Sequence, residues 1–280
     1  MSTQLKYDLA FLRKHFAEME LAKDCREKAE AKIARAVGSK GKLIWSKLPS
    51  LLTVNPKVVK GEKYGHMTGI LHFAPTFWSG ENFCPFASAG CGLGCLTTSG
   101  HGQLHMMENG SHHVHIARVT RSLLYIRYRD QFMKKLEREI ATLIRRAKRA
   151  NALPAVRLNG TSDRLWEKEQ PYLFSMFPNV TFYDYTKVPN RDVSHIPNYS
   201  LTFSLNENNR DAAFDQPLNV AVVFRLKKNE PLPKEWKGKE VIDGDVNDLR
   251  FLDKINVHVG LRTKGDTYND TSGFAIDVAV

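Results

Sequence analysis

The sequence predicts an α/β fold, with an irregular or incomplete parallel (β/α) barrel-like domain behind an N-terminal helical extension. Three observations lead to this prediction. Short runs of apolar, β-branched and aromatic residues recur from residue 68 onward, which is typical of strands. Helical or loop segments separate these runs, as parallel strands require. The later separating segments are too short for full helices, so we expect the barrel to be irregular.

The first segment is predicted to be a helix, because its apolar residues step by four and three positions and so share one face. These residues are Leu5, Leu9, Leu12, Phe16 and Met19. This face could pair with another chain as a coiled coil, but the pattern is short, which favours docking on the rest of the protein. We therefore expect a basic helix and linker over residues 1–50 and the barrel-like domain over 51–280.

The elements of the main domain follow in order along the chain. The expected strands are 68–74, 154–158, 180–184, 199–203, 219–224, 240–242 and 257–261. The expected helices are 114–150, 167–177 and 208–214. A Gly-rich and Cys-rich loop, 77–110, lies between the first strand and the long helix.

The Cys-rich loop is the densest chemical signal, because Cys84, Cys91 and Cys95 form a C-x6-C-x3-C pattern. Glycines let a backbone fold tightly around thiolates, which indicates a metal site. Zinc would need a fourth ligand, such as His101 or His105, whereas an iron–sulfur cluster could leave one iron open. The alternative is three reduced structural cysteines. The loop resembles the cluster loop of radical-SAM enzymes in its position after a first strand and before a long helix. Its cysteine spacing differs from the usual C-x3-C-x2-C of those enzymes.

Polar residues follow five successive expected strands, where active groups of parallel α/β folds are found. They are Asn159, Asp163, Asp184, Lys187, Asn206, Arg225 and Asp243. Two carboxylates in one site could act as nucleophile and general acid/base, or could hold a divalent ion. The alternative is ordinary capping and turn chemistry.

The net charge of +11 is concentrated in two segments. Residues 1–60 carry a net +7 and residues 118–149 a net +8, which suggests a polyanionic partner such as DNA. Solvated helix faces are the alternative. The candidate phosphate contacts are Arg118, Arg121, Arg127, Arg145, Arg146 and Arg149. A helix cannot present all of them to one duplex.

The composition also bears on the compartment. No apolar run approaches the roughly 18 residues that span a bilayer, and the N-terminus lacks the apolar core of a secretion signal. Four cysteines, three of them in one loop, do not form a secreted disulfide framework. We expect a protein of the host cytoplasm without a membrane partner. A homo-oligomer or a protein partner bound through the N-terminal helix is left open.

Several stretches resemble an uncharacterised family of phage-encoded proteins and, more distantly, the mycobacteriophage gene product 88 group. The resemblance covers about residues 50–275 and omits the N-terminal helix. The stretches are 52–57, the Cys84–Cys95 loop with its CPxAxxGC motif, 117–118, RLNGTSD at 157–163, FYDYTK at 182–187, 198–204, VIDGD at 241–245, 248–253 and 259–265. The resemblance implies a phage or prophage origin and no particular activity.

Together these features predict a DNA-modifying enzyme of phage origin. One mechanism is base exchange, as in transglycosylases, with Asp163 and Asp184 as nucleophile and acid/base. The other is iron–sulfur radical chemistry at Cys84, Cys91 and Cys95. The alternative functions are a non-catalytic DNA-binding or host-inhibiting protein, and an enzyme of small metabolites.

Overall fold

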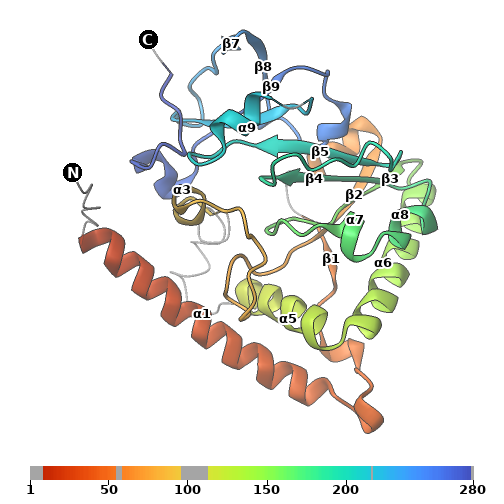
Figure 1. Ribbon diagram of the computed structural model, residues 1–280. Helices are drawn as coiled ribbons and strands as arrows, with labels where there is room; N and C mark the ends of the chain where they lie inside the picture. Colours follow the sequence, from red (N-terminus) through yellow and green to blue (C-terminus); the bar gives the residue numbers. More distant parts are fainter. Residues whose placement is uncertain (1–8, 55–58, 96–112, 216, 279–280) are drawn as a thin grey trace.

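The computed structural model describes residues 9–54, 59–95, 113–215 and 217–278. Within these residues one sheet runs in the order β1-β2-β3-β4-β5-β6-β9-β8-β7 (Figure 1). The strands are β1 (Leu52–Thr53), β2 (His66–Leu71), β3 (Leu153–Arg157), β4 (Thr181–Thr186), β5 (Tyr199–Ser204), β6 (Val220–Phe224), β7 (Glu235–Trp236), β8 (Lys239–Asp243) and β9 (His258–Arg262). All neighbours from β2 to β8 pair in parallel, and β1 and β7 are antiparallel to their neighbours.

The parallel α/β class predicted from the sequence is confirmed. Each of the seven expected strands is present, with bounds within three residues of the prediction, and the two-residue strands β1 and β7 were missed. The sheet is open: in the described part of the chain, β1 and β7 are its two edges and do not pair with each other. Closure into a barrel is therefore not observed. The short antiparallel strands at both ends are a common way to protect sheet edges.

The described helices are α1 (Leu9–Ala36), α3 (Ala89–Leu93), α5 (His113–Arg127), α6 (Arg129–Arg149), α7 (Trp166–Glu169), α8 (Tyr172–Met176) and α9 (Arg210–Phe214). Short 3-10 helices are η1 (Ser39–Gly41), η2 (Trp45–Lys47), η3 (Lys60–Tyr64), η4 (Arg250–Leu252) and η5 (Gly265–Asn269). The single helix predicted over 167–177 is two short helices, because Pro171 lacks the N–H that would continue the first.

The long helix predicted over 114–150 is interrupted at Tyr128, whose φ of −132° and ψ of 45° are not helical. The Arg129 side chain, rather than a helical N–H, donates from Nε to the Tyr125 carbonyl at 3.0 Å. The Arg129 guanidinium also lies 3.9 Å from the centre of the Tyr125 ring. The Arg129 side chain therefore replaces the backbone N–H as the donor to the Tyr125 carbonyl. The sequence did not predict this interruption, because no glycine or proline lies within residues 114–150.

The N-terminal helix docks on the body, as expected, and packs against α5 (Figure 1). Its buried face is formed by Leu21, Cys25, Ala29, Ile33 and Ala36. Met19, which was assigned to the docking face, is 55% exposed, and the earlier residues of the predicted stripe lie outside the described side chains. The docking face is thus carried by the second half of α1.

A large core lies between the first half of the sheet and helices α1, α5 and α6. Phe73 is at its centre, with ring centres 4.8 Å from Phe83 and 5.2 Å from Tyr125. A smaller core around Phe203 and Phe224 serves the second half. Within the described residues, no helix has the length and hydropathy to cross a membrane.

Candidate functional site

The three cysteines are carried by a loop that leaves the carboxyl end of β2 and crosses the edge of the parallel sheet. Phe83 anchors the loop: it is fully buried, and its carbonyl accepts a hydrogen bond from the N–H of Asp163 at 2.8 Å. Gly80 has a φ of +95°, and a Cβ there would meet the Arg26 guanidinium at 2.9 Å. The loop is therefore held between the end of β3 and helix α1 before it reaches the cysteines.

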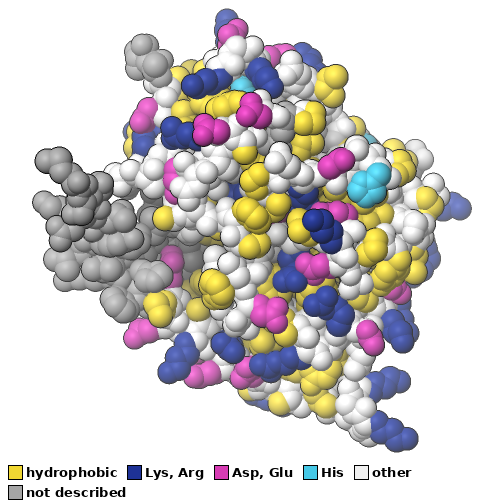
Figure 2. Space-filling view, viewed as in Figure 1, with side chains coloured by type: hydrophobic (Ala, Val, Ile, Leu, Met, Phe, Trp, Pro, Cys, Tyr) yellow, Lys and Arg dark blue, Asp and Glu magenta, His cyan; other side chains and the backbone are white. Residues whose placement is uncertain are grey.

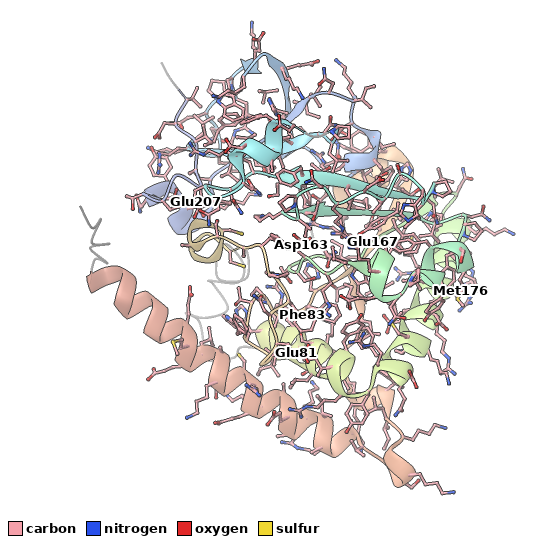
Figure 3. All side chains as sticks on the ribbon, in the orientation of Figure 1. Glu81, Phe83, Asp163, Glu167, Met176 and Glu207 are labelled. Atoms are coloured by element: carbon pink, nitrogen blue, oxygen red, sulfur yellow. The ribbon has the colours of Figure 1, made fainter. Side chains whose placement is uncertain are left out.

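Helix α3, which contains Cys91, is held by a carboxylate from the segment that follows β5. Glu207, which follows β5, accepts hydrogen bonds from the Ser88 hydroxyl at 2.6 Å and from the Gly90 N–H at 2.7 Å. Ser88 caps the helix by accepting from the Cys91 N–H at 3.2 Å. Figure 3 shows Glu207 beside α3, and labels Phe83, which precedes α3 on the Cys loop, and Asp163, which follows β3. The helix is thus fixed to the carboxyl end of β5.

The described thiols lie close enough to influence one another. Cys84, Cys91 and Cys95 are not in disulfides, and all three are partly buried. Burial raises the pKa of the Cys84 thiol to about 12, and the neighbouring Cys95, Cys91 and Asp163 raise it further. The Cys84 Sγ donates to the Thr161 carbonyl at 3.6 Å. The structure therefore brings the three predicted cysteines together at the carboxyl edge of the sheet.

Two cations approach this group of thiols. The Lys187 Nζ donates to the Ser204 hydroxyl at 2.8 Å. Burial lowers the pKa of Lys187, but Cys91, Asp163 and Cys84 outweigh burial and raise it overall. Burial likewise lowers the pKa of Arg118, and Cys95 opposes that effect. Lys187 thus lies near Cys91, and Arg118 lies near Cys95. We call Cys84, Cys91, Cys95, Lys187 and Arg118 the thiol site.

Asp163 connects the thiol site to a buried ion-pair network. Its Oδ2 accepts from the Lys187 backbone N–H at 2.7 Å, and its Oδ1 accepts from Arg191 at 3.1 Å. Arg191 also pairs with Glu167 at 2.7 Å, with side-chain exposures of 2% and 4%. Burial raises the pKa of Asp163, opposed by the Lys187 N–H and by Arg191. Both carboxylate oxygens are engaged within the protein.

Asp184 was expected at the end of a strand, among the polar strand-end residues, but β4 continues to Thr186, so Asp184 lies inside the sheet. It is fully buried, and its oxygens accept from the Asn159 N–H at 2.7 Å, the Asn159 side chain at 3.1 Å and the Tyr199 hydroxyl at 2.9 Å. Burial raises its pKa to about 7. The Asn159 side-chain oxygen accepts from the Ser162 hydroxyl and the Arg164 N–H. Asp184 and Asn159 therefore shape the loop that presents Asp163.

The remaining predicted strand-end residues lie elsewhere. Asn206 donates to the Phe86 carbonyl at 3.2 Å and so helps to hold the Cys loop. Arg225 pairs with Asp277 and lines a separate pocket of about 720 Å³ with Arg210 and the segment from Asn269 to Asp277. Asp243 pairs with Arg262 at 2.9 Å. Asp243 ends β8 and Asp184 lies in β4, and four strand spacings, or roughly 19 Å across the sheet, separate these two strands.

Of the four predicted metal ligands, Cys84, Cys91 and Cys95 lie in the thiol site, whereas His101 lies outside the described residues. In the described part of the chain, no three His, Cys, Asp or Glu side chains are placed to hold a metal ion. A single zinc ion needs every ligand atom within about 2.3 Å of one point. The described thiols do not form such a site.

The arginines predicted to bind phosphates do not share one surface. Arg118 lies at the thiol site, and Arg121 is buried, with its Nε donating to the Ser50 carbonyl at 2.7 Å. Arg127 is paired with Glu30 at 2.7 Å. Arg145, Arg146 and Arg149 are exposed near the end of α6, which leads into the amino end of β3. The set is therefore split between the two ends of the sheet, because the break at Tyr128 turns α6 away from α5.

Sequence reasoning missed the residues that hold the site together. Glu207 directly follows Asn206, which was selected as a strand-end residue, so the position of Glu207 could have identified it as a candidate site residue. Arg191 and Glu167 gave no such signal, because the ion pairs of Arg191 with Asp163 and Glu167 join the segment after β4 to the segment after β3. Ser204, the last residue of β5, belonged to a strand-end motif but was not selected.

Comparison with known proteins identifies one family. The family model described as Gene product 88 matches residues 27–278, which include α1 from its middle onward and the whole sheet. The resemblance of the motifs to the phage gene product 88 group is thereby confirmed. No curated protein and no solved structure matches the chain.

Proposed function

The chain belongs to the gene product 88 family, and we propose that it is a DNA-modifying enzyme whose reactive centre is an iron–sulfur cluster held by Cys84, Cys91 and Cys95. The observation that carries the proposal is the gathering of these three thiols with Lys187 and Arg118 at the carboxyl edge of the parallel sheet. Parallel α/β enzymes place their reactive groups at this edge. The absence of disulfides among the described cysteines fits the reducing host cytoplasm in which we propose that the enzyme acts.

The alternative mechanism, base exchange by Asp163 and Asp184, has less support. A nucleophilic carboxylate must reach its substrate, but Asp184 has no exposed surface and accepts three internal hydrogen bonds. Asp163 is bound by Arg191 and by the Lys187 N–H. Both carboxylates serve the architecture of the site, which leaves the thiols as the reactive candidates.

The donor set fits a cluster better than a single ion. The described thiols influence one another electrostatically without converging on one point. Each cysteine of a [4Fe–4S] cluster binds a different iron, so the sulfurs need not converge. Thiols bind iron as thiolates, and nearby positive charge favours that form. Lys187 near Cys91 and Arg118 near Cys95 supply this charge.

In this proposal the chain's own residues position and shield the centre. Glu207 holds α3, and therefore Cys91, against the end of β5. Ser204 orients the Lys187 ammonium, and Asp163 fixes the backbone of Lys187. Phe73 and Phe83, both fully buried, close the base of the loop against water. A bound cluster would supply one-electron chemistry at this edge.

The test is metal analysis of the full chain purified without oxygen. We expect iron and sulfide in comparable amounts, with broad visible absorption that reduction bleaches. Single Cys84→Ala, Cys91→Ala and Cys95→Ala variants should each lose most of the iron. Cys25→Ala is the matched control, because Cys25 is a free thiol buried in the α1 interface, and it should keep its iron.

Stoichiometric zinc, or iron that survives all three substitutions, would contradict the cluster. Incubation of the reduced protein with DNA, followed by mass spectrometry of the released nucleosides, tests the activity. DNA binding without any altered nucleoside would instead support the non-catalytic DNA-binding alternative.

A further inference from the structure

A basic groove lies beside α1, and none of the residues of the thiol site lines it. It has a volume of about 450 Å³ and is lined by Lys28, Lys32, Arg35, Lys47 and Ile116. The four charged lining residues are all cationic, and all four are exposed. Figure 2 shows dark-blue Lys and Arg side chains, mixed with acidic ones, over the lower part of the molecule, where α1, α5 and α6 lie.

Helix geometry places three of these cations in a row. Lys28, Lys32 and Arg35 are separated by four and three residues, so they lie within about 60° of one another on α1. This row directly borders the buried face of the helix, which contains Ile33 and Ala36. The side chains therefore stand along the edge of the groove. The row spans about 10 Å of helix axis, close to three steps of one DNA strand at about 3.4 Å each.

The fourth cation comes from a separate element and is held in place by α1. Lys47, at the end of η2, donates from Nζ to the Arg35 carbonyl at 3.2 Å, near the carboxyl end of α1. Lys28 pairs with Asp24 at 2.8 Å. For Lys32 and Arg35, the described residues provide no ion-pair partner. Within the part of the chain that the structure describes, the groove thus carries two positive charges that no ion pair compensates.

The floor of the groove shows that it is not the reaction site. Ile116, which lines the groove, lies two residues before Arg118 on α5. Two residues of helix correspond to a rotation of about 200°, so these two side chains point to nearly opposite sides of α5. Arg118 lies near Cys95. The groove and the thiol site are therefore on opposite sides of α5.

We propose that this groove binds the phosphodiester backbone of the nucleic acid substrate, through Lys32, Arg35 and Lys47. The inference rests on the proposed function for its choice of nucleic acid. A polyanion suits the groove because it can satisfy several cations at once and release counterions. Binding of this kind positions the chain and is independent of base sequence.

The test measures the affinity of the full-length protein for a fluorescein-labelled 20-base-pair DNA duplex at several NaCl concentrations. Each lost phosphate contact lowers the slope of log Kd against log salt by about 0.9. Lys32→Gln/Arg35→Gln should therefore lower the slope by about 1.8, and Lys47→Gln alone by about 0.9. The matched control is Lys228→Gln/Lys234→Gln, two exposed lysines in the segment between β6 and the edge strand β7, which should leave the slope unchanged.

An unchanged slope in the groove variants, or an equal fall in the Lys228→Gln/Lys234→Gln control, would overturn the proposal. Binding of the wild type to phosphatidylserine vesicles but not to DNA would also overturn it. Thermal unfolding by circular dichroism checks that the variants are folded. Iron content of the same preparations separates the two proposals: iron-free protein with the expected slopes refutes the cluster alone, and iron-loaded protein with unchanged slopes refutes the groove alone.

Discussion

The carboxylate of Glu207 accepts a hydrogen bond of 2.6 Å from the hydroxyl of Ser88, a residue 119 positions earlier in the chain. The same carboxylate accepts from the Gly90 N–H, so one side chain at the end of β5 holds the start of α3. This contact fixes the loop of the thiol site to the sheet. The stability and reactivity of the loop should therefore depend on a residue outside the cysteine motif.

Glu207→Gln should loosen the Cys loop, because an amide cannot accept both hydrogen bonds and loses the charge that strengthens them. We expect the free energy of unfolding to fall by about 1–3 kcal/mol. Alkylation of Cys91 and Cys95 by iodoacetamide, followed by mass spectrometry, should become faster. Glu230→Gln, which alters a surface carboxylate that accepts only from the Lys227 N–H, is the control. Equal alkylation rates in wild type and Glu207→Gln would contradict the role of this clamp.

Gly90→Ala and Gly92→Ala should change stability in opposite directions. A Cβ at Gly90 would collide with Ser272 and Phe274, whereas nothing lies within 4 Å of a Cβ at Gly92. Overpacking should lower the free energy of unfolding of Gly90→Ala by about 1–3 kcal/mol. Alanine is the better helix former, so Gly92→Ala should be neutral or stabilising by up to about 1 kcal/mol. Urea unfolding of both variants tests this, and similar losses would show that α3 is packed differently.

Arg191→Ala should be strongly destabilising, because it leaves the buried Glu167 and Asp163 without their cation. Removing one partner of a buried ion pair costs about 3–5 kcal/mol. Arg146→Ala, at an exposed position on α6, should change the free energy of unfolding by less than about 0.5 kcal/mol. Both values come from urea unfolding at neutral pH. A small loss in Arg191→Ala would mean that water replaces the guanidinium.

Asp184 should make the stability of the wild type depend on pH. Its pKa in the folded protein is about 7, raised by burial, against about 3.9 in an unfolded chain. Between these values the folded state binds the extra proton, so this contribution is fully present below about pH 4 and is lost as the pH rises to about 7. The difference in free energy of unfolding between wild type and Asp184→Asn should therefore shrink from pH 5 to pH 7.5. A difference that stays constant or grows would show that Asp184 is ionised in the folded protein.

Much of the fold could be predicted because a buried strand is marked by a short run of apolar residues in the sequence. The apolar run 219–224 corresponds to β6 and the run 199–203 to β5, since both are buried whatever their neighbours are. The break at Tyr128 could not be predicted, because the cause is the Arg129 side chain bonding the Tyr125 carbonyl. For the site, the C-x6-C-x3-C spacing pointed to the thiols, whereas Asp184 was misplaced because β4 extends two residues further than its apolar pattern.

The sequence by itself determined the class of the fold, the order of the seven parallel strands along the chain and the loop that carries the cysteines. These depend on composition and periodicity, which act over a few residues. Only the tertiary structure decided that the sheet stays open, that Lys187 and Arg118 approach the thiols, and that Asp243 and Arg225 do not. It also divided the basic residues between the two ends of the sheet. Such outcomes depend on which strands become neighbours and which side of a helix is buried, and both are settled by packing between distant segments.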